Sequence, residues 1–178
     1  MNRTTHTLIY ATVAAFAAIA IGLLVYLTGM SQNWMNLSYL TYITVTVLAL
    51  KSWRDKEKGG FISFGAGMGY STVYALFYSI VMAIWTYVFF AIIAPGFMMD
   101  QMMKQQSMME AKGMSPEQIE MGMKFAKMFM SPGIMAVMAL FAGMIFYTII
   151  NLIIVAIMKK DPPMNFDNMN PPINTSAY

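Results

Sequence analysis

The side chains with the most distinctive chemistry are methionines gathered in one polar part of the chain. Residues 98–124 carry nine of them in twenty-seven positions and read MMDQMMKQQSMMEAKGMSPEQIEMGMK. Thioether sulfur is a soft ligand that selects Cu(I). On a helix, one turn would bring two pairs together, Met98 with Met102 and Met99 with Met103. The first chemical hypothesis is therefore a Cu(I) site on these four residues.

The same methionines also follow the spacing of an apolar helix face. Met98, Met99, Met102, Met103 and Met109 recur along one side of a helix, and methionine is a flexible filler of such faces. The chain has no cysteine, and its one histidine lies far away in the sequence, so nothing strengthens a metal site. We interpret the methionines as packing residues, expect no cofactor, and keep Cu(I) handling as the alternative.

Two other polar residues could do chemistry, and each has a simpler interpretation. His6 precedes the first apolar stretch, where we expect a solvated residue at the membrane interface. Asn151 is the one strongly polar residue deep in an apolar stretch, and an amide there usually bonds a neighbouring helix. Because no titratable groups converge within the apolar stretches, we expect no enzymatic activity.

The apolar stretches that must position these residues indicate a membrane protein. Of the 178 residues, 58% are hydrophobic and 11% are charged, whereas soluble domains carry about 25% charged residues. No charge falls in residues 7–50, 61–99 or 128–158, and roughly 20 apolar residues in a helix cross the hydrocarbon layer. We predict an all-α polytopic protein with one integral membrane domain, residues 1–160, in contact with the lipid bilayer.

The pattern predicts four transmembrane helices and one amphipathic helical hairpin. The spans are expected at residues 8–30, 34–53, 66–94 and 133–158, with the hairpin at 97–130 between the third and the fourth. Within the hairpin, Gly113 favours a helix end, and Ser115 with Gln118 forms a capping-box motif at the next helix start. Residues 161–178 are rich in proline and asparagine, which predicts a disordered tail.

Small residues mark places where helices could approach one another closely. The predicted helix-packing residues are Ala14, Ala18 and Gly22 on the first span, Gly65 and Gly69 on the third, and Asn151 on the fourth. Such positions are compatible with a homo-oligomer or with a membrane-protein partner.

Tryptophans and basic residues predict the orientation. Trp34 and Trp53 would place one indole at each membrane interface. With four spans, seven basic residues share one side: Arg3, Lys51, Arg54, Lys56, Lys58, Lys159 and Lys160. The hairpin carries four lysines balanced by four acids. By the positive-inside rule, both termini and the tail are expected in the cytoplasm and the hairpin outside.

Several motifs, taken together, resemble one family of proteins. They are KSWRDKEKGGFISFGAGMGY, IIAPGFMMDQMM, KGMSPEQIE and KMFMSPG, in that order. Over about residues 8–160 the chain is similar to the small bacterial membrane proteins of domain-of-unknown-function family 4199. The resemblance implies four transmembrane helices and a bacterial inner-membrane location. It supplies no activity and no catalytic residue.

Two classes of function remain. The first is a structural or accessory membrane protein that acts through contacts with itself, a partner or lipid. The second is passage of small molecules or ions through an oligomer, along a path lined by Thr41, Thr44 and Asn151, or Cu(I) handling. The small net charge of +3 lies mostly in loops next to the membrane, so nucleic-acid binding is not indicated.

Overall fold

Helices build the whole fold in this computed structural model, which describes residues 2–29 and 36–162. The elements are α1 (Arg3–Thr28), α2 (Asn36–Glu57), α3 (Phe64–Val88), the short π-helix η2 (Phe89–Ile93), α4 (Pro95–Ala111), α5 (Pro116–Phe129) and α6 (Pro132–Met158). The predicted all-α fold class is confirmed. Trp34 and residues 163–178 lie outside the described residues, so the predictions made for them stay predictions.

Three helices of the described part are long and apolar enough to cross a membrane by length and composition. They are α1, α3 continued through η2 to Ile93, and α6. The predicted second span, residues 34–53, corresponds to α2, which is long enough to cross a membrane but not apolar enough to be counted with these three. Asparagine, serine and threonines are interspersed along α2, and its last two turns are charged from Lys51 onward. The count of four spans is therefore not confirmed by composition.

Local signals decide where the helices begin and end. α1 begins at Arg3, before the apolar stretch, because the Asn2 side chain accepts a hydrogen bond from the Thr4 amide at 3.4 Å and caps the helix. It ends at Gly29, which has the left-handed φ of 63°. α2 continues to Glu57, beyond the predicted end at residue 53. The capping box is present at α5, between Ser115 and Gln118.

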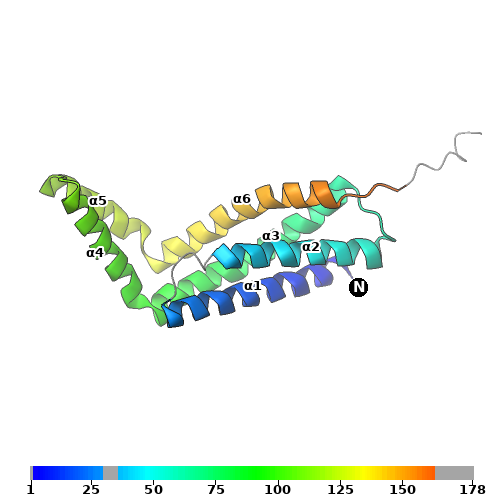
Figure 1. The fold of residues 1–178 in the computed structure, drawn as a ribbon, viewed down its shortest axis with the longest axis horizontal. Coiled ribbons are helices and arrows are strands. Elements are labelled where there is room, and N and C mark those ends of the chain that lie inside the picture. The colour runs from blue at the N-terminus through cyan, green and yellow to red at the C-terminus, as the bar shows by residue number, and fades with distance from the viewer. Residues whose placement is uncertain (1, 30–35, 163–178) are drawn as a thin grey trace, which may run out of the picture.

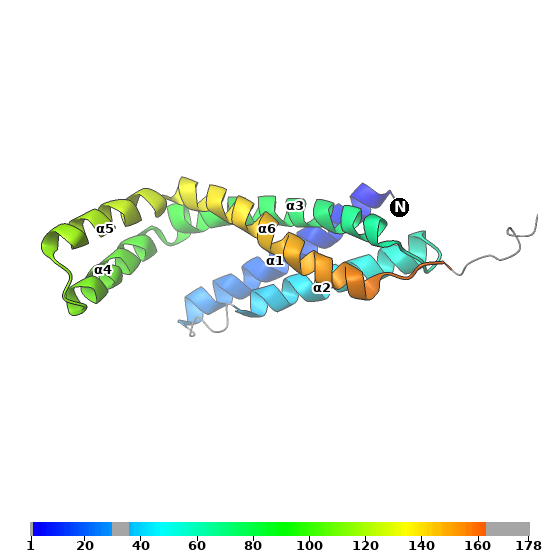
Figure 2. The same cartoon turned by 90° about the horizontal axis from the view of Figure 1, so that it is seen from above.

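Four helices lie side by side in an elongated bundle (Figures 1 and 2). α1 and α3 run in one direction, whereas α2 and α6 return in the other. α3 packs against both α1 and α6, and α2 packs mainly against α1. The N-terminal end of α1 and the C-terminal end of α6 therefore lie at the same end of the bundle.

The α4–α5 pair projects from the opposite end and departs from the direction of α3 and α6 (Figure 1). The bend between α3 and α4 has a backbone cause. The Ala94 amide donates to the Phe89 carbonyl at 2.7 Å, a π-type bond that widens the last turn. Pro95 then prevents continuation of the ladder and starts α4.

Candidate functional site: buried polar junctions between helices

The first junction joins α1, α2 and α3 around His6. The His6 side chain is only 3% exposed. Its Nδ1 lies 2.8 Å from the Tyr70 hydroxyl on α3, and its Nε2 lies 3.3 Å from Ser52 Oγ on α2. The ring also stacks on Tyr10, with centroids 4.6 Å apart. The prediction of a solvated His6 is wrong, because α1 begins early enough to carry this residue into the bundle.

Trp53 belongs to the same end of the bundle. Its indole is buried and stacks on Tyr70, with ring centroids 4.8 Å apart. The Lys58 ammonium lies 5.4 Å from the centre of the indole ring. The indole predicted as an interface anchor thus packs into the protein, and Lys58, in the loop after α2, lies over it. Its level in a membrane stays a prediction.

The second junction joins α2, α3 and α6 around Asn151, which is fully buried. The Tyr42 hydroxyl donates to Asn151 Oδ1 at 3.1 Å, and Asn151 Nδ2 donates to the Ser71 carbonyl at 3.0 Å. Both polar ends of the amide are therefore used, each toward a different helix. An amide satisfied in this way links three helices through one side chain.

Tyrosines connect the two junctions. Tyr70, Tyr74 and Tyr78 follow one another at single-turn spacing on α3, and all three are buried. The rings of Tyr74 and Tyr78 contact Tyr42 from α2, and Tyr78 also contacts Tyr147 from α6. The rings of Tyr42 and Tyr147 stack on each other with centroids 4.1 Å apart. These aromatic side chains form the packing surface of α3.

The chemistry available at these junctions is hydrogen bonding. The buried polar side chains of the described residues are the imidazole of His6, the amide of Asn151, and hydroxyls, with no carboxylate or amine among them. The hydroxyls of Ser71, Tyr74 and Ser79 are buried without a hydrogen-bond partner in the part of the chain described.

Glycine contacts differ from those expected. A close contact between α3 and α6 is at Gly67, where an added Cβ would lie 2.7 Å from Val155 Cγ1. A Cβ at Gly22 or Gly65 would meet nothing within 4 Å, and one at Gly69 would meet only the Arg3 guanidinium at 3.8 Å. Within a single chain, these three glycines are therefore not points of close helix approach. By contrast, the predicted packing residues Ala14 and Ala18 are buried in the bundle core.

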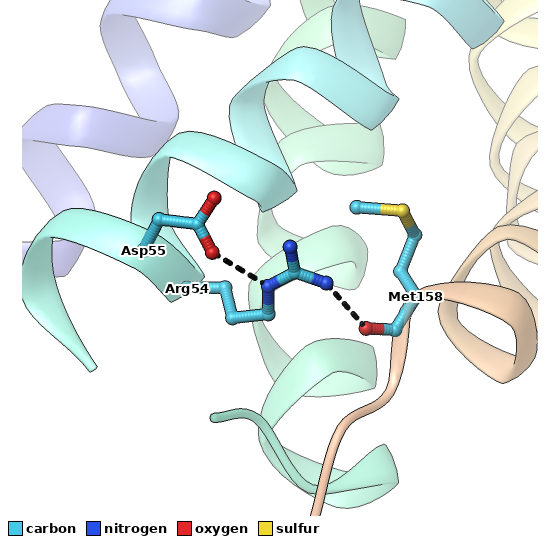
Figure 3. A network of polar contacts seen from close by, with 3 residues as sticks. All are labelled: Arg54, Asp55 and Met158. Atoms are coloured by element: carbon cyan, nitrogen blue, oxygen red, sulfur yellow. Dashed lines mark hydrogen bonds and ion pairs between the residues drawn. The ribbon is translucent and has the colours of Figure 1, made fainter. Parts of the chain in front are cut away.

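Hydrogen bonds that join α2 and the α2–α3 connection to the end of α6 close the charged end of the bundle, and we term them the latch (Figure 3). Arg54 Nε donates to Asp55 Oδ1 at 2.7 Å, and Arg54 Nη1 donates to the Met158 carbonyl at 3.3 Å. The hydrogen bond from Arg54 holds the pKa of the Asp55 carboxyl below its ordinary value. Ile62 and Lys160 exchange two backbone hydrogen bonds, of 2.8 and 3.0 Å. The α2–α3 connection is thus tied to the end of α6.

The methionines proposed as Cu(I) ligands divide into two environments on α4. Met98 and Met102 are half-buried, whereas Met99 is 61% and Met103 53% exposed. Half-buried Met109 contacts α5, since its Cε lies 2.7 Å from where a Cβ on Gly122 would be. The described residues contain no cluster of three or more His, Cys, Asp or Glu side chains able to hold a metal ion. The thioether hypothesis stays a prediction.

The threonines proposed to line a path do not join Asn151. Thr44 is exposed, whereas Asn151 is fully buried. The hydroxyls of Thr41 and Thr46 donate to the carbonyls of Leu37 and Tyr42, one turn earlier. These hydroxyls are therefore satisfied within their own helix.

Sequence reasoning missed most of the partners in the two junctions. Tyr42, Ser52 and Tyr147 carried no individual signal, because a tyrosine or serine in an apolar helix is compatible with any rotation of that helix. The spacing of Tyr70, Tyr74 and Tyr78 was the one available indication. It indicated that aromatic side chains line one face of α3, but it did not identify the residues of other helices that contact this face.

Comparison with known proteins adds a family. No curated protein and no solved structure matches the chain. One family does match, over residues 9–160, and its description is "Protein of unknown function (DUF4199)". That range covers the Asn151 junction, the latch and the α4–α5 pair, and it agrees with the motifs noted in the sequence. Of the first junction it includes Tyr10, Ser52, Trp53 and Tyr70 but not His6. The chain therefore belongs to the DUF4199 family.

Proposed function

We propose that this protein is a four-pass, non-enzymatic structural or accessory protein of the bacterial inner membrane. It acts through helix–helix, lipid or partner contacts. The observation that carries the proposal is the use of its buried polar side chains. His6 and Asn151 each bond two other helices, so the polar groups of the bundle hold helices together.

The path of the chain supports a fourth crossing by α2. α1 and α3 run in the same direction along the bundle, so the chain has to return between them, and α2 is the segment that returns (Figures 1 and 2). If α1 and α3 cross a membrane, α2 crosses it too. Its 22 residues extend about 33 Å at 1.5 Å per residue, and the hydroxyls of Thr41 and Thr46 donate to backbone carbonyls of the same helix.

The distribution of charge supports cytoplasmic termini. The seven basic residues lie at the start of α1, in the last two turns of α2, just after α2 and just after α6, which is the end of the bundle where α1 begins and α6 ends. The α4–α5 pair, with equal numbers of lysines and acids, lies at the other end. The positive-inside rule then assigns the latch end to the cytoplasm.

The arrangement favours a contact role over passage of a solute. A conduit needs polar groups that face a common water-filled space, whereas Asn151 has both polar ends bonded to protein and Thr44 faces outward. Passage through an oligomer is the competing function, since a path between copies would be lined by outward residues such as Thr44.

The discriminating experiment is flux through vesicles that contain the purified protein. We expect potassium, proton and Cu(I) fluxes equal to those of protein-free vesicles. Asn151→Leu should lower thermal stability in detergent or alter the oligomer distribution, with flux unchanged. The proposal is overturned if the wild type conducts and an Asn151→Leu protein of unaltered stability loses that flux.

A further inference from the structure

The α4–α5 pair exposes an apolar face on α5. Met121 is 65%, Phe125 60% and Met128 59% exposed, and Phe129 is half-exposed. Their spacing of four, three and one residues places them on one side of the helix. The opposite side, with Ile119, Gly122 and Ala126, is partly buried toward α4. This face is therefore left over after the two helices have packed together.

This face continues the exposed apolar surface of α6. Only Met130 and Ser131 separate α5 from α6. Beyond them, α6 exposes a run of large apolar side chains that includes Ile134, Val137, Met138 and Phe141. A helix that crosses a bilayer presents such side chains to lipid, so the α5 face extends a lipid-facing surface toward the edge of the membrane.

Aromatic residues at the bend place the base of the pair at the level of that edge. Phe89 contacts Tyr26, Trp85 and Phe97, with ring centroids 5.1, 5.7 and 6.5 Å apart. Tyr87, next to this cluster, is half-exposed. Tryptophan and tyrosine are enriched where the hydrocarbon meets the headgroups.

Charge is unevenly distributed along the pair. The base, residues 96–107 and 122–132, carries Lys104, Lys124 and Lys127 against Asp100, a net charge of +2. The tip, residues 108–121, carries Lys112 against Glu110, Glu117 and Glu120, a net charge of −2. The base therefore suits an anionic lipid surface, and the tip suits water.

We propose that the base of the α4–α5 pair is an interfacial membrane-binding element. Phe125, Met128 and Phe129 insert at the headgroup–acyl boundary of the leaflet at that end of the spans, and the lysines of the base lie among anionic headgroups. The combination of large apolar side chains on one face with lysines beside them is that of a helix lying in the interface. The inference rests on the proposal that α6 crosses the bilayer and is independent of the protein's role.

Spin labels at single cysteines test this directly, because the native chain has no cysteine to remove. The full-length protein is reconstituted into vesicles of phosphatidylcholine and phosphatidylglycerol. Labels at Phe125→Cys and Met128→Cys report the apolar face. A label at Lys127→Cys is the matched control, one residue along and about 100° around the same helix. Collision of each label with oxygen, which partitions into lipid, is compared with collision with a water-soluble nickel chelate.

We expect the labels at positions 125 and 128 to collide several-fold more with oxygen than with nickel, and the label at 127 to show the reverse. Nickel collisions dominating at all three positions would overturn the proposal, because the face would then be in water. Exclusion of both reagents at 125 and 128 would also overturn it, because the face would then be covered by protein, either a second copy or a partner. A label at Phe141→Cys on α6 separates the two proposals. If it too is not in lipid, the membrane-spanning proposal itself fails.

Discussion

At the scale of single residues, the protein satisfies polar side chains within an otherwise apolar bundle. Hydrocarbon offers no hydrogen-bond partners, so a buried polar group is stabilised when it finds one in another helix or in its own backbone. Among the described residues, the hydroxyls of Ser71, Tyr74 and Ser79 are exceptions. Asn151 does so at both ends, and His6 does so at both ring nitrogens. These two side chains therefore define how α1, α2, α3 and α6 are rotated about their own axes.

The Tyr42–Asn151 hydrogen bond can be measured by a double-mutant cycle. Asn151→Leu should lower the free energy of unfolding in detergent by about 1–2 kcal/mol, since it removes bonds to two helices. Tyr42→Phe keeps the stacked ring and should cost about 0.6 kcal/mol. Because the two residues share one bond, the double variant should be less destabilised than the sum of the single variants. Strict additivity in unfolding by denaturing detergent would show that the bond contributes nothing.

Gly67 gives a second residue-scale prediction with a control on the same helix. Gly67→Ala should lower unfolding stability by about 1–3 kcal/mol, because its Cβ would clash with the Val155 side chain. Gly65→Ala should be neutral or raise stability by up to about 1 kcal/mol, because its Cβ meets open space and alanine favours a helix. Both are read from thermal unfolding of the purified protein. Equal destabilisation by the two variants would contradict the α3–α6 contact.

At the scale of elements, caps and breaks position the α4–α5 pair. The π-type turn and Pro95 end the run of α3 and redirect the chain, and Ser131 caps the start of α6 by accepting from the Ile134 amide at 3.4 Å. Between them, the capping box starts α5, and Gly113 turns the chain with a φ of 72°. The direction of the pair is therefore fixed at both ends by backbone chemistry rather than by the methionines.

The role of the α4 methionines is tested by replacing sulfur without changing apolar character. In a variant with Met98, Met99, Met102 and Met103 all changed to leucine, we expect normal insertion and a stability change below about 1.5 kcal/mol, since leucine and methionine are similar in volume and helix propensity. Cu(I) titration with a competing chelator should show no stoichiometric binding by the wild type. Tight wild-type binding that disappears in the leucine variant would establish the thioether site instead.

At the scale of the whole molecule, the bundle is polarised along its length. The latch of Arg54 with Met158 and the Ile62–Lys160 bonds lie at the end that carries both termini, and the α4–α5 pair lies at the other. Hydrogen bonds close the bundle at the first end. At the other end, we propose that the base of the α4–α5 pair lies at the membrane interface.

Labelling of single cysteines tests the orientation of the whole chain. Cysteines at Ser31 and Gln106 should react with an impermeant maleimide in intact cells, and one at Ser176 should react only after the membrane is opened, because four crossings place the tail in the cytoplasm. Permeabilised cells supply the control for reactivity at each site. Labelling at Ser176 together with protection at Gln106 would invert the topology. Protection at Ser31 with labelling at Gln106 would instead contradict a crossing by α2.

The sequence by itself determined the local and one-dimensional features of the protein. Clustering of charge and length of apolar stretches predicted an all-helical chain, the capping box and Gly113 predicted the break between α4 and α5, and the ordered motifs predicted the family. Each of these features depends on residues close together in the chain, whose effects on the backbone do not require knowledge of distant partners.

Only the tertiary structure decided which faces meet. It placed a close contact between α3 and α6 at Gly67, and it buried His6 against Tyr70 and Ser52. The physical reason is that an apolar helix is nearly uniform around its circumference, so its sequence hardly restricts its rotation. That rotation is set by packing and by the few cross-helix hydrogen bonds, which join residues as far apart in the chain as Tyr42 and Asn151.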